Sequence, residues 1–200
     1  MNINDNFSCP LTYNDNTWAS ITSCDQDGCN EYIEKNIEKF VNKKVLHVGI
    51  GNSSVFCKFC DVFLHLDGIT IMDLETIVAD NIKSKFCNSC TYEIYKFNKY
   101  DVGNFSKIGK YDLIIDNNLK TYSCCLNHWI EYFHCIVEKL EKNGILLTHM
   151  QGFVPHTNRV DALSVEELEI LCHLHENFIL IVDDLVNEFG YYPVLIKRLG

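Results

Sequence analysis

Small and polar residues near position 50 have the types and spacing of a nucleotide-binding turn. Gly49 and Gly51 allow positive φ angles and let a ligand come close to the backbone. Asn52, Ser53 and Ser54 follow, and their side chains can cap the first turn of a helix. A Gly-x-Gly turn between a strand and a helix N-terminus favours a nucleotide site. The alternative is a tight turn of an α/β domain that binds nothing.

An acidic residue stands at the distance from this turn at which a ribose is usually bound. Asp73 lies about 20 residues beyond Gly51, where nucleotide-binding folds place a carboxylate. Its two oxygens match the two adjacent hydroxyls of a ribose. We expect Asp73 to end a second strand over 68–73 and, with Leu74, to contact a cofactor. Alternatively, Asp73 is only the N-cap of the next helix.

Apolar periodicity predicts alternating strands and helices around these residues. Val45, Leu46, Val48 and Ile50 form a short run typical of a strand covered on both faces. The predicted helices lie at 29–41, after the glycine turn, at 75–82, from Trp129 to the stop at Gly144, and at 164–175. Further strands are predicted at 92–97, 111–118, 144–149, 178–182 and 192–197, with a short extended piece at 62–66.

The segment 43–54 resembles the first motif of the class I S-adenosylmethionine (SAM)-dependent methyltransferases. That motif is an apolar strand, often an acidic residue, and then Gly-x-Gly-x-Gly. The chain departs from it at the third glycine, where it has Ser53, and at the acidic position, where it has His47. An NAD-type fingerprint would need glycine at the position of Ser54, so that pattern is incomplete as well.

Later segments extend the resemblance over residues 43–149. Asp101-Val102 stands where the family places an acidic residue facing the adenine, and Asp116 and Asn117 follow a strand of the family's fourth type. The helix, strand, link and strand after 164 match the family's closing pattern. The resemblance implies an α/β fold, a three-layer Rossmann-like sandwich with a mostly parallel seven-stranded sheet and an antiparallel last strand. It implies SAM as cofactor and S-adenosylhomocysteine as product.

We expect one domain over residues 1–200, because the composition suits a single core and no linker is evident. Residues 1–30 would be an N-terminal arm or lid, 43–149 the cofactor-binding core, 150–163 a substrate loop, and 164–200 the closing helix and strand pair. Tyr13 and Trp18 of the arm and His156 of the loop could cover a ligand. For the arm, aromatic residues that merely pin a terminus are an equal alternative.

Methyl transfer in this family is an in-line displacement that relies mainly on positioning, so a weak base suffices. The candidates for that base are His149 at the end of the fifth strand, Asp116 at the end of the fourth, and His128 and His156, which lie nearby in the sequence. His149 is the first choice, because a neutral imidazole accepts a proton near pH 7. A purely structural histidine is the alternative.

Charge and hydropathy restrict the partners. A formal charge of −10 with scattered Lys and Arg argues against nucleic acid, so we expect a small-molecule acceptor. The start of the chain is not a signal peptide and no apolar run could span a bilayer, which predicts a cytoplasmic protein without membrane contact. A homodimer is left open.

Eleven cysteines without a secretion signal predict reduced thiols. The pairs Cys57/Cys60 and Cys87/Cys90 have the spacing of zinc ligands. Cys57 and Cys60 are expected on the sheet-facing side of a helix, where thiols behave as small hydrophobes, so no metal is predicted.

Two other functions use the same features. An NAD-linked oxidoreductase could use the glycine turn, although helix and strand alternation would then be expected to continue to the C-terminus. A methyltransferase-like module without catalysis is conceivable because of His47 and Ser53.

Overall fold

The computed structural model describes residues 28–86, 90–117, 119–120, 126–149, 165–175, 177–183 and 193–200. Its helices are α1 (Gly28–Lys35), η2 (Ile37–Lys39), α2 (Ser54–Phe59), α3 (Asp73–Phe86), η3 (Val102–Lys107), α4 (Leu126–Glu138) and α5 (Val165–His173). Its strands are β1 (Lys44–Val48), β2 (His65–Thr70), β3 (Thr91–Lys96), β4 (Tyr111–Asp116), β5 (Leu140–His149), β6 (Phe178–Val182) and β7 (Pro193–Arg198).

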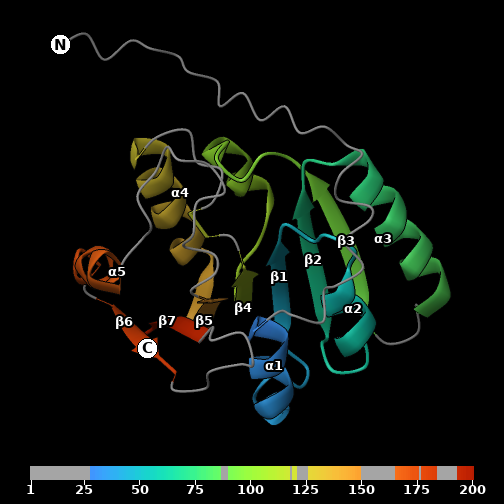
Figure 1. The fold of residues 1–200 in the computed structure, drawn as a ribbon, viewed down its shortest axis with the longest axis horizontal. Coiled ribbons are helices and arrows are strands. Elements are labelled where there is room, and N and C mark those ends of the chain that lie inside the picture. Colours follow the sequence, from blue (N-terminus) through green and yellow to red (C-terminus); the bar gives the residue numbers. More distant parts are fainter. Residues whose placement is uncertain are drawn as a thin grey trace, which may run out of the picture.

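The strands form one seven-stranded sheet in the order β3-β2-β1-β4-β5-β7-β6 (Figure 1). The first five strands are parallel, and β7 is antiparallel to both β5 and β6, between which it lies. This arrangement confirms the predicted mostly parallel sheet with an antiparallel last strand. The carboxyl ends of β1 to β4 lie at one edge, where open α/β sheets bind ligands.

Two apolar clusters cover the two faces of the sheet. Leu46 and Val48 of β1 pack with Trp129 and other α4 residues on one face, while Val45 packs with residues of α1 and α2 on the other. Residues 45–48 of β1 are therefore buried on both faces, as their apolar run predicted. Helices on both faces give the three layers of a doubly wound fold (Figure 1).

The second strand begins and ends earlier than the sequence suggested. β2 runs from His65 to Thr70, so the predicted strand over 68–73 is wrong at both ends, and Asp73 opens α3. The glycine that looked like a strand start, Gly68, lies in the middle of β2. A Cβ there would come within 2.6 Å of the Ile50 side chain, so the crowded sheet requires glycine at this point.

The sequence-based prediction also misplaced the ends of two helices, at points where the chain turns within a few residues. The predicted helix over 29–41 divides into α1 and the short η2. α4 ends at Glu138, and β5 already begins at Leu140, not at Gly144 as predicted. Pairing of β4 with β5 shifts between Tyr111 and Leu113, and this irregularity accommodates the extra residues.

The two edges of the sheet differ in polarity. The edge strand β3 carries Glu93 and Lys96. The other edge strand, β6, is entirely apolar, and its residues Ile179 and Ile181 are each 40% exposed. Among the described residues, no helix has the length and hydrophobicity needed to cross a membrane.

Candidate functional site

The turn after β1 alternates left-handed residues. Gly49 has φ 72°, Gly51 φ 53° and Ser53 φ 60°. The Gly49 amide donates to the Ile69 carbonyl of β2 at 2.8 Å, which holds the turn against the end of that strand. A Cβ built on Gly49 or Gly51 would meet no atom within 4 Å, so there is open space beside both. The turn has the form of a cradle for a ligand.

Ser53 stands at the third glycine position of the motif, and its own backbone is left-handed. The side chain is buried, and its hydroxyl forms a 2.9 Å hydrogen bond with the hydroxyl of Tyr92 on β3. The Tyr92 ring stacks on Phe56 of α2, with centroids 4.2 Å apart. Burial raises the pKa of Tyr92, so the phenol stays protonated. The serine preserves the turn at the cost of an unfavourable φ.

The first turn of α3 places Asp73 at the rim of the sheet. Its side chain is 76% exposed and forms an ion pair with Lys96 at the end of β3. Leu74, its predicted companion, is half-buried in the same turn. The strand-end position expected for a carboxylate is held by Thr70 instead.

A second acid of α3 lies against the glycine turn. The Thr70 hydroxyl donates to Glu75 Oε2 at 2.5 Å, and the backbone N–H of Gly51 also donates to this carboxylate. Burial raises the pKa of Glu75, while these two hydrogen bonds oppose that shift. Thr70 in turn accepts from the Met72 amide at 3.0 Å. The half-buried carboxylate of Glu75 therefore joins the end of β2 to Gly51.

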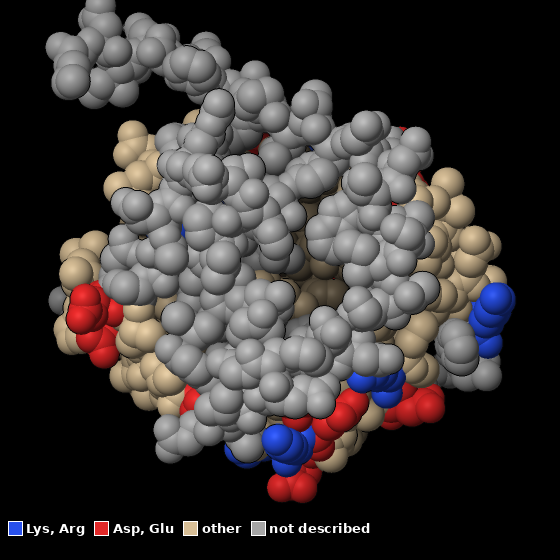
Figure 2. Space-filling view, viewed as in Figure 1, with Lys and Arg blue, Asp and Glu red and all other residues tan. Residues whose placement is uncertain are grey.

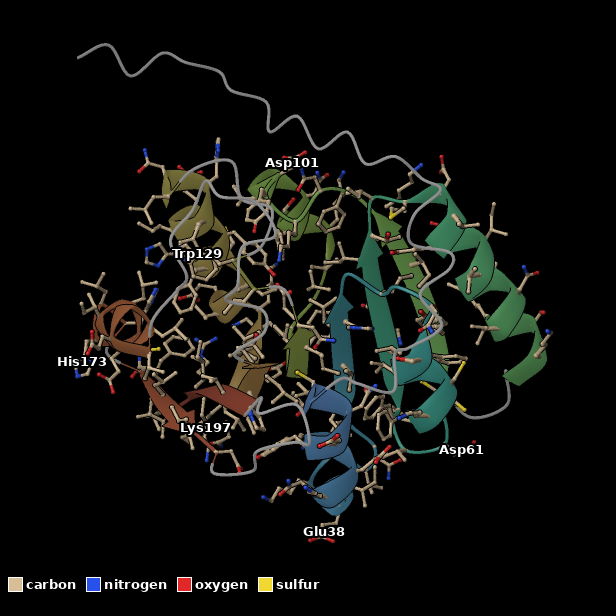
Figure 3. All side chains as sticks on the ribbon, in the orientation of Figure 1. Glu38, Asp61, Asp101, Trp129, His173 and Lys197 are labelled. Carbon is tan, nitrogen blue, oxygen red and sulfur yellow. The ribbon has the colours of Figure 1, made fainter. Side chains whose placement is uncertain are left out.

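Asp101 ends the loop between β3 and η3, and Val102 is the first residue of η3. Asp101 is exposed, and its carboxylate accepts from the Asn104 amide at 2.6 Å, while Val102 is half-buried. Figure 3 places Asp101 at the end of the molecule opposite to Glu38 and Asp61, above the carboxyl ends of the strands. The loop thus lies at the same end of the sheet as the glycine turn.

Asp116 ends β4 and is completely buried in a charged cluster. Lys99 donates to its two oxygens at 3.3 and 3.0 Å, and the Tyr132 hydroxyl of α4 donates to Oδ2 at 2.6 Å. Lys99 also donates to the Leu119 carbonyl at 3.3 Å. Burial lowers the pKa of Lys99, and the carboxylate opposes that shift. The cluster ties the loop after β3 to the loop after β4 and to α4.

The remaining predicted site residues are spread around this edge or lie outside the described residues. Asn117 follows β4 and is half-buried, His128 is half-buried in the first turn of α4, and exposed Asn52 accepts from the Ser54 amide at 3.1 Å. His149 ends β5, and its side chain lies outside the described part. Tyr13, Trp18 and His156 are outside the described residues, as is the loop 150–163.

The cysteines form no metal cluster in the part of the chain that the structure describes. Cys60 is buried as predicted, but Cys57 is exposed, so the expectation that both face the sheet was wrong for Cys57. Helix α2 is only six residues long, and Cys57, three residues after Ser54, lies on its exposed side. Cys87 lies outside the described residues.

Three polar residues at this edge were not singled out from the sequence. Tyr132 lies on the apolar face of α4, and a tyrosine in such a position signals a buried hydroxyl with a partner. An acid in a first helical turn, as Glu75 is, normally indicates only a favourable interaction with the helix dipole. Lys99 had no distinguishing signal, because a lysine in a loop is usually solvated.

No family model and no curated protein matches the sequence. Several solved structures match the fold. N-methyltransferase NodS from Bradyrhizobium japonicum WM9 is 11% identical, with coverage of 86% of this chain and 94% of that chain and a TM-score of 0.62. Magnesium protoporphyrin IX methyltransferase ChlM from Synechocystis PCC 6803, with bound SAM, is 9% identical, with 85% and 77% covered and a TM-score of 0.64.

An rRNA methylase from Streptococcus thermophilus is 10% identical, with 86% of this chain and 97% of that chain covered and a TM-score of 0.58. NodS has also been solved in complex with S-adenosyl-L-homocysteine. The fold of this chain is therefore the Rossmann-like fold of the class I SAM-dependent methyltransferases. At these identities the likeness concerns the fold, and the chemistry depends on the residues at its carboxyl edge.

Proposed function

We propose that this protein binds SAM at the turn after β1 and transfers its methyl group to a small polar molecule. The observation that carries this proposal is the turn itself. Gly49 and Gly51 have positive φ and open space beside them, next to the half-buried carboxylate of Glu75 at the carboxyl end of the sheet. A ligand with an amino-acid tail and a ribose fits such a set of groups.

Each part of the ligand has residues nearby that match its chemistry. The turn from Gly49 to Ser53 would hold the amino-acid tail, a carboxylate at the start of α3 the ribose, and Asp101 with Val102 the adenine. Asp116 and Asn117 at the end of β4 would border the reacting end.

The sulfonium of SAM supplies an activated methyl group. The chain's contribution is to hold the acceptor in line with that methyl, and such positioning can lower a barrier by about 7–11 kcal/mol. His149, Asp116 and His128 are the candidates for accepting the acceptor's proton. Asp116 already accepts hydrogen bonds from Lys99 and Tyr132, so as a base it would act within this cluster.

The proposal of a small-molecule methyl acceptor rests on the charge of the chain. The chain carries a formal charge of −10, and the described Lys, Arg, Asp and Glu side chains visible in Figure 2 are mixed along its margin. A phosphate backbone requires clustered basic residues, so a small molecule fits this surface better than RNA. Fluorescence anisotropy with a labelled RNA hairpin at physiological salt tests this, and micromolar binding would contradict it.

The decisive experiment is calorimetric titration with S-adenosylhomocysteine. Binding with a dissociation constant in the micromolar range is expected, together with a rise in melting temperature. No heat at high micromolar ligand would contradict the proposal. Binding without turnover of labelled SAM by any acceptor in a metabolite panel would favour the non-catalytic module.

The NAD-linked alternative is disfavoured by the strand order. Dinucleotide-binding sheets typically continue with parallel strands in the order 3-2-1-4-5-6. Here β7 is inserted antiparallel between β5 and β6. A thermal shift with NAD and none with S-adenosylhomocysteine would reverse this preference.

A further inference from the structure

The end of β2 lacks the carboxylate that a nucleotide site is expected to have there, although the glycine turn after β1 is present. β2 ends at Thr70, whose hydroxyl is buried and cannot replace the two acceptor oxygens of an acid. Two acids in the first turn of α3, Asp73 and Glu75, could supply the missing group.

Asp73 is exposed at the start of α3 and is paired with a lysine of β3. Its side chain is 76% exposed, and it forms an ion pair with Lys96, which is itself 50% exposed at the end of the edge strand β3. A carboxylate in this position is solvated and already neutralised by an ion pair. Its contribution to ligand binding would therefore be small.

Glu75 is turned towards the glycine turn. Its carboxylate accepts from the Gly51 backbone N–H and from the Thr70 hydroxyl, which fix its position between β1 and β2. A carboxylate has about four lone-pair sites, so after two such bonds it can still accept from two hydroxyl groups. Neither of these two donors is charged, so its negative charge is not neutralised by them.

We propose that Glu75, oriented by Thr70 and Gly51, is the residue that holds the ribose diol of the adenosyl ligand, in place of an acid at the end of β2. This inference rests on the proposed function. It assigns the ribose to a helix residue, and it gives Thr70 the role of a positioning residue that acts through Glu75.

A group retained for binding should cost stability in the absence of its ligand. Burial raises the pKa of Glu75, which means that the charged form is less favourable here than in water. In Glu75→Gln the side chain keeps its size and one acceptor oxygen but no longer carries the half-buried charge. The melting temperature of the ligand-free variant is therefore expected not to fall, whereas a purely structural role predicts a fall.

The test is calorimetry of the full chain with S-adenosylhomocysteine and with its 2′-deoxy analogue. Glu75→Gln is expected to bind S-adenosylhomocysteine about 10- to 100-fold more weakly than the wild type, as for loss of hydrogen bonds to a charged group. It should also lose most of the wild type's preference for the ribose over the deoxyribose ligand. Asp80→Asn, an exposed change on the same helix, is the matched control.

Asp73→Asn tests the competing assignment of the ribose to Asp73. Its loss of affinity for S-adenosylhomocysteine must be smaller than that of Glu75→Gln. A larger loss in Asp73→Asn, with the ribose preference retained in Glu75→Gln, would overturn the inference while leaving the proposed function intact. Absence of binding by the wild type would defeat both. If Glu75→Gln does not fold, Glu75→Asp, which keeps the charge but withdraws it by one methylene, should show the same loss of affinity and preference.

Discussion

Ser53 has a backbone conformation that is unfavourable for any residue with a side chain. Its φ of 60° costs about 1–2 kcal/mol relative to glycine, and its hydrogen bond to Tyr92 compensates for part of that cost. Ser53→Ala keeps the strain and loses the bond, so we expect it to lower the free energy of unfolding by about 1–3 kcal/mol.

Ser53→Gly loses the same bond but removes the strain, so it should be the more stable of the two variants. Urea unfolding monitored by circular dichroism measures both, with Tyr92→Phe as the partner for a double-mutant cycle. A glycine variant no more stable than the alanine variant would show that the turn does not require the left-handed conformation.

Lys99 and Asp116 form a buried ion pair whose two members depend on each other. Lys99→Met would leave a completely buried carboxylate with Tyr132 and without its cation, and we expect a loss of about 3–5 kcal/mol in the free energy of unfolding. Lys96→Met removes the cation of an exposed pair and should cost no more than about 1 kcal/mol. Chemical denaturation of the two variants side by side makes the comparison, and equal losses would contradict it.

At the scale of elements, the irregular start of β5 depends on one glycine. A Cβ on Gly144 would lie 2.9 Å from the backbone oxygens of Glu141 and Tyr111, which cannot move independently of the sheet. We expect Gly144→Ala to destabilise the protein by about 1–3 kcal/mol. Gly109→Ala, where a Cβ would meet nothing within 4 Å, is the control and should be nearly neutral. Thermal unfolding of the two variants measures this difference, and similar melting temperatures would contradict the prediction.

The sequence predicted that each of these segments is a strand more accurately than it predicted where each strand begins and ends. β6 was located at its observed bounds, because an uncharged apolar run bounded by polar residues leaves few choices. β2 was displaced because Gly68 looks like a boundary when its neighbours are unknown. The cause of that glycine is the side chain of Ile50, which lies in another element.

Local patterns located the glycine turn and the loops around it, but not the contacts between elements. The spacing of Asp73 from Gly51 fitted a ribose ligand, yet the hydrogen bonds to the turn and to the end of β2 are made by Glu75, whose direction depends on how α3 packs. Likewise, the pairing of Lys99 with Asp116 brings together residues 17 positions apart in the chain and could not be deduced from either position alone.

At the scale of the molecule, β7 connects the edge of the sheet to its centre. Ile196 is completely buried between β5 and β6, whereas Ile179 on the edge strand is 40% exposed. Ile196→Asp should cost about 4 kcal/mol or more and deplete the soluble folded protein, because it places a charge in the core. Ile179→Asp should leave the protein folded. Soluble yield and far-ultraviolet circular dichroism measure both, and a folded Ile196→Asp protein would contradict the prediction.

The insertion of β7 between β5 and β6 also has a consequence for biosynthesis. The ribosome makes β6 first, but its described pairing partner in the sheet is the later strand β7. A nascent chain that has emerged from the exit tunnel only as far as residue 183 can assemble the five parallel strands, while the apolar strand β6 has no paired neighbour yet. During that interval the segment 178–182 is a natural target for chaperones, and the edge is completed only when residues 193–198 have left the exit tunnel.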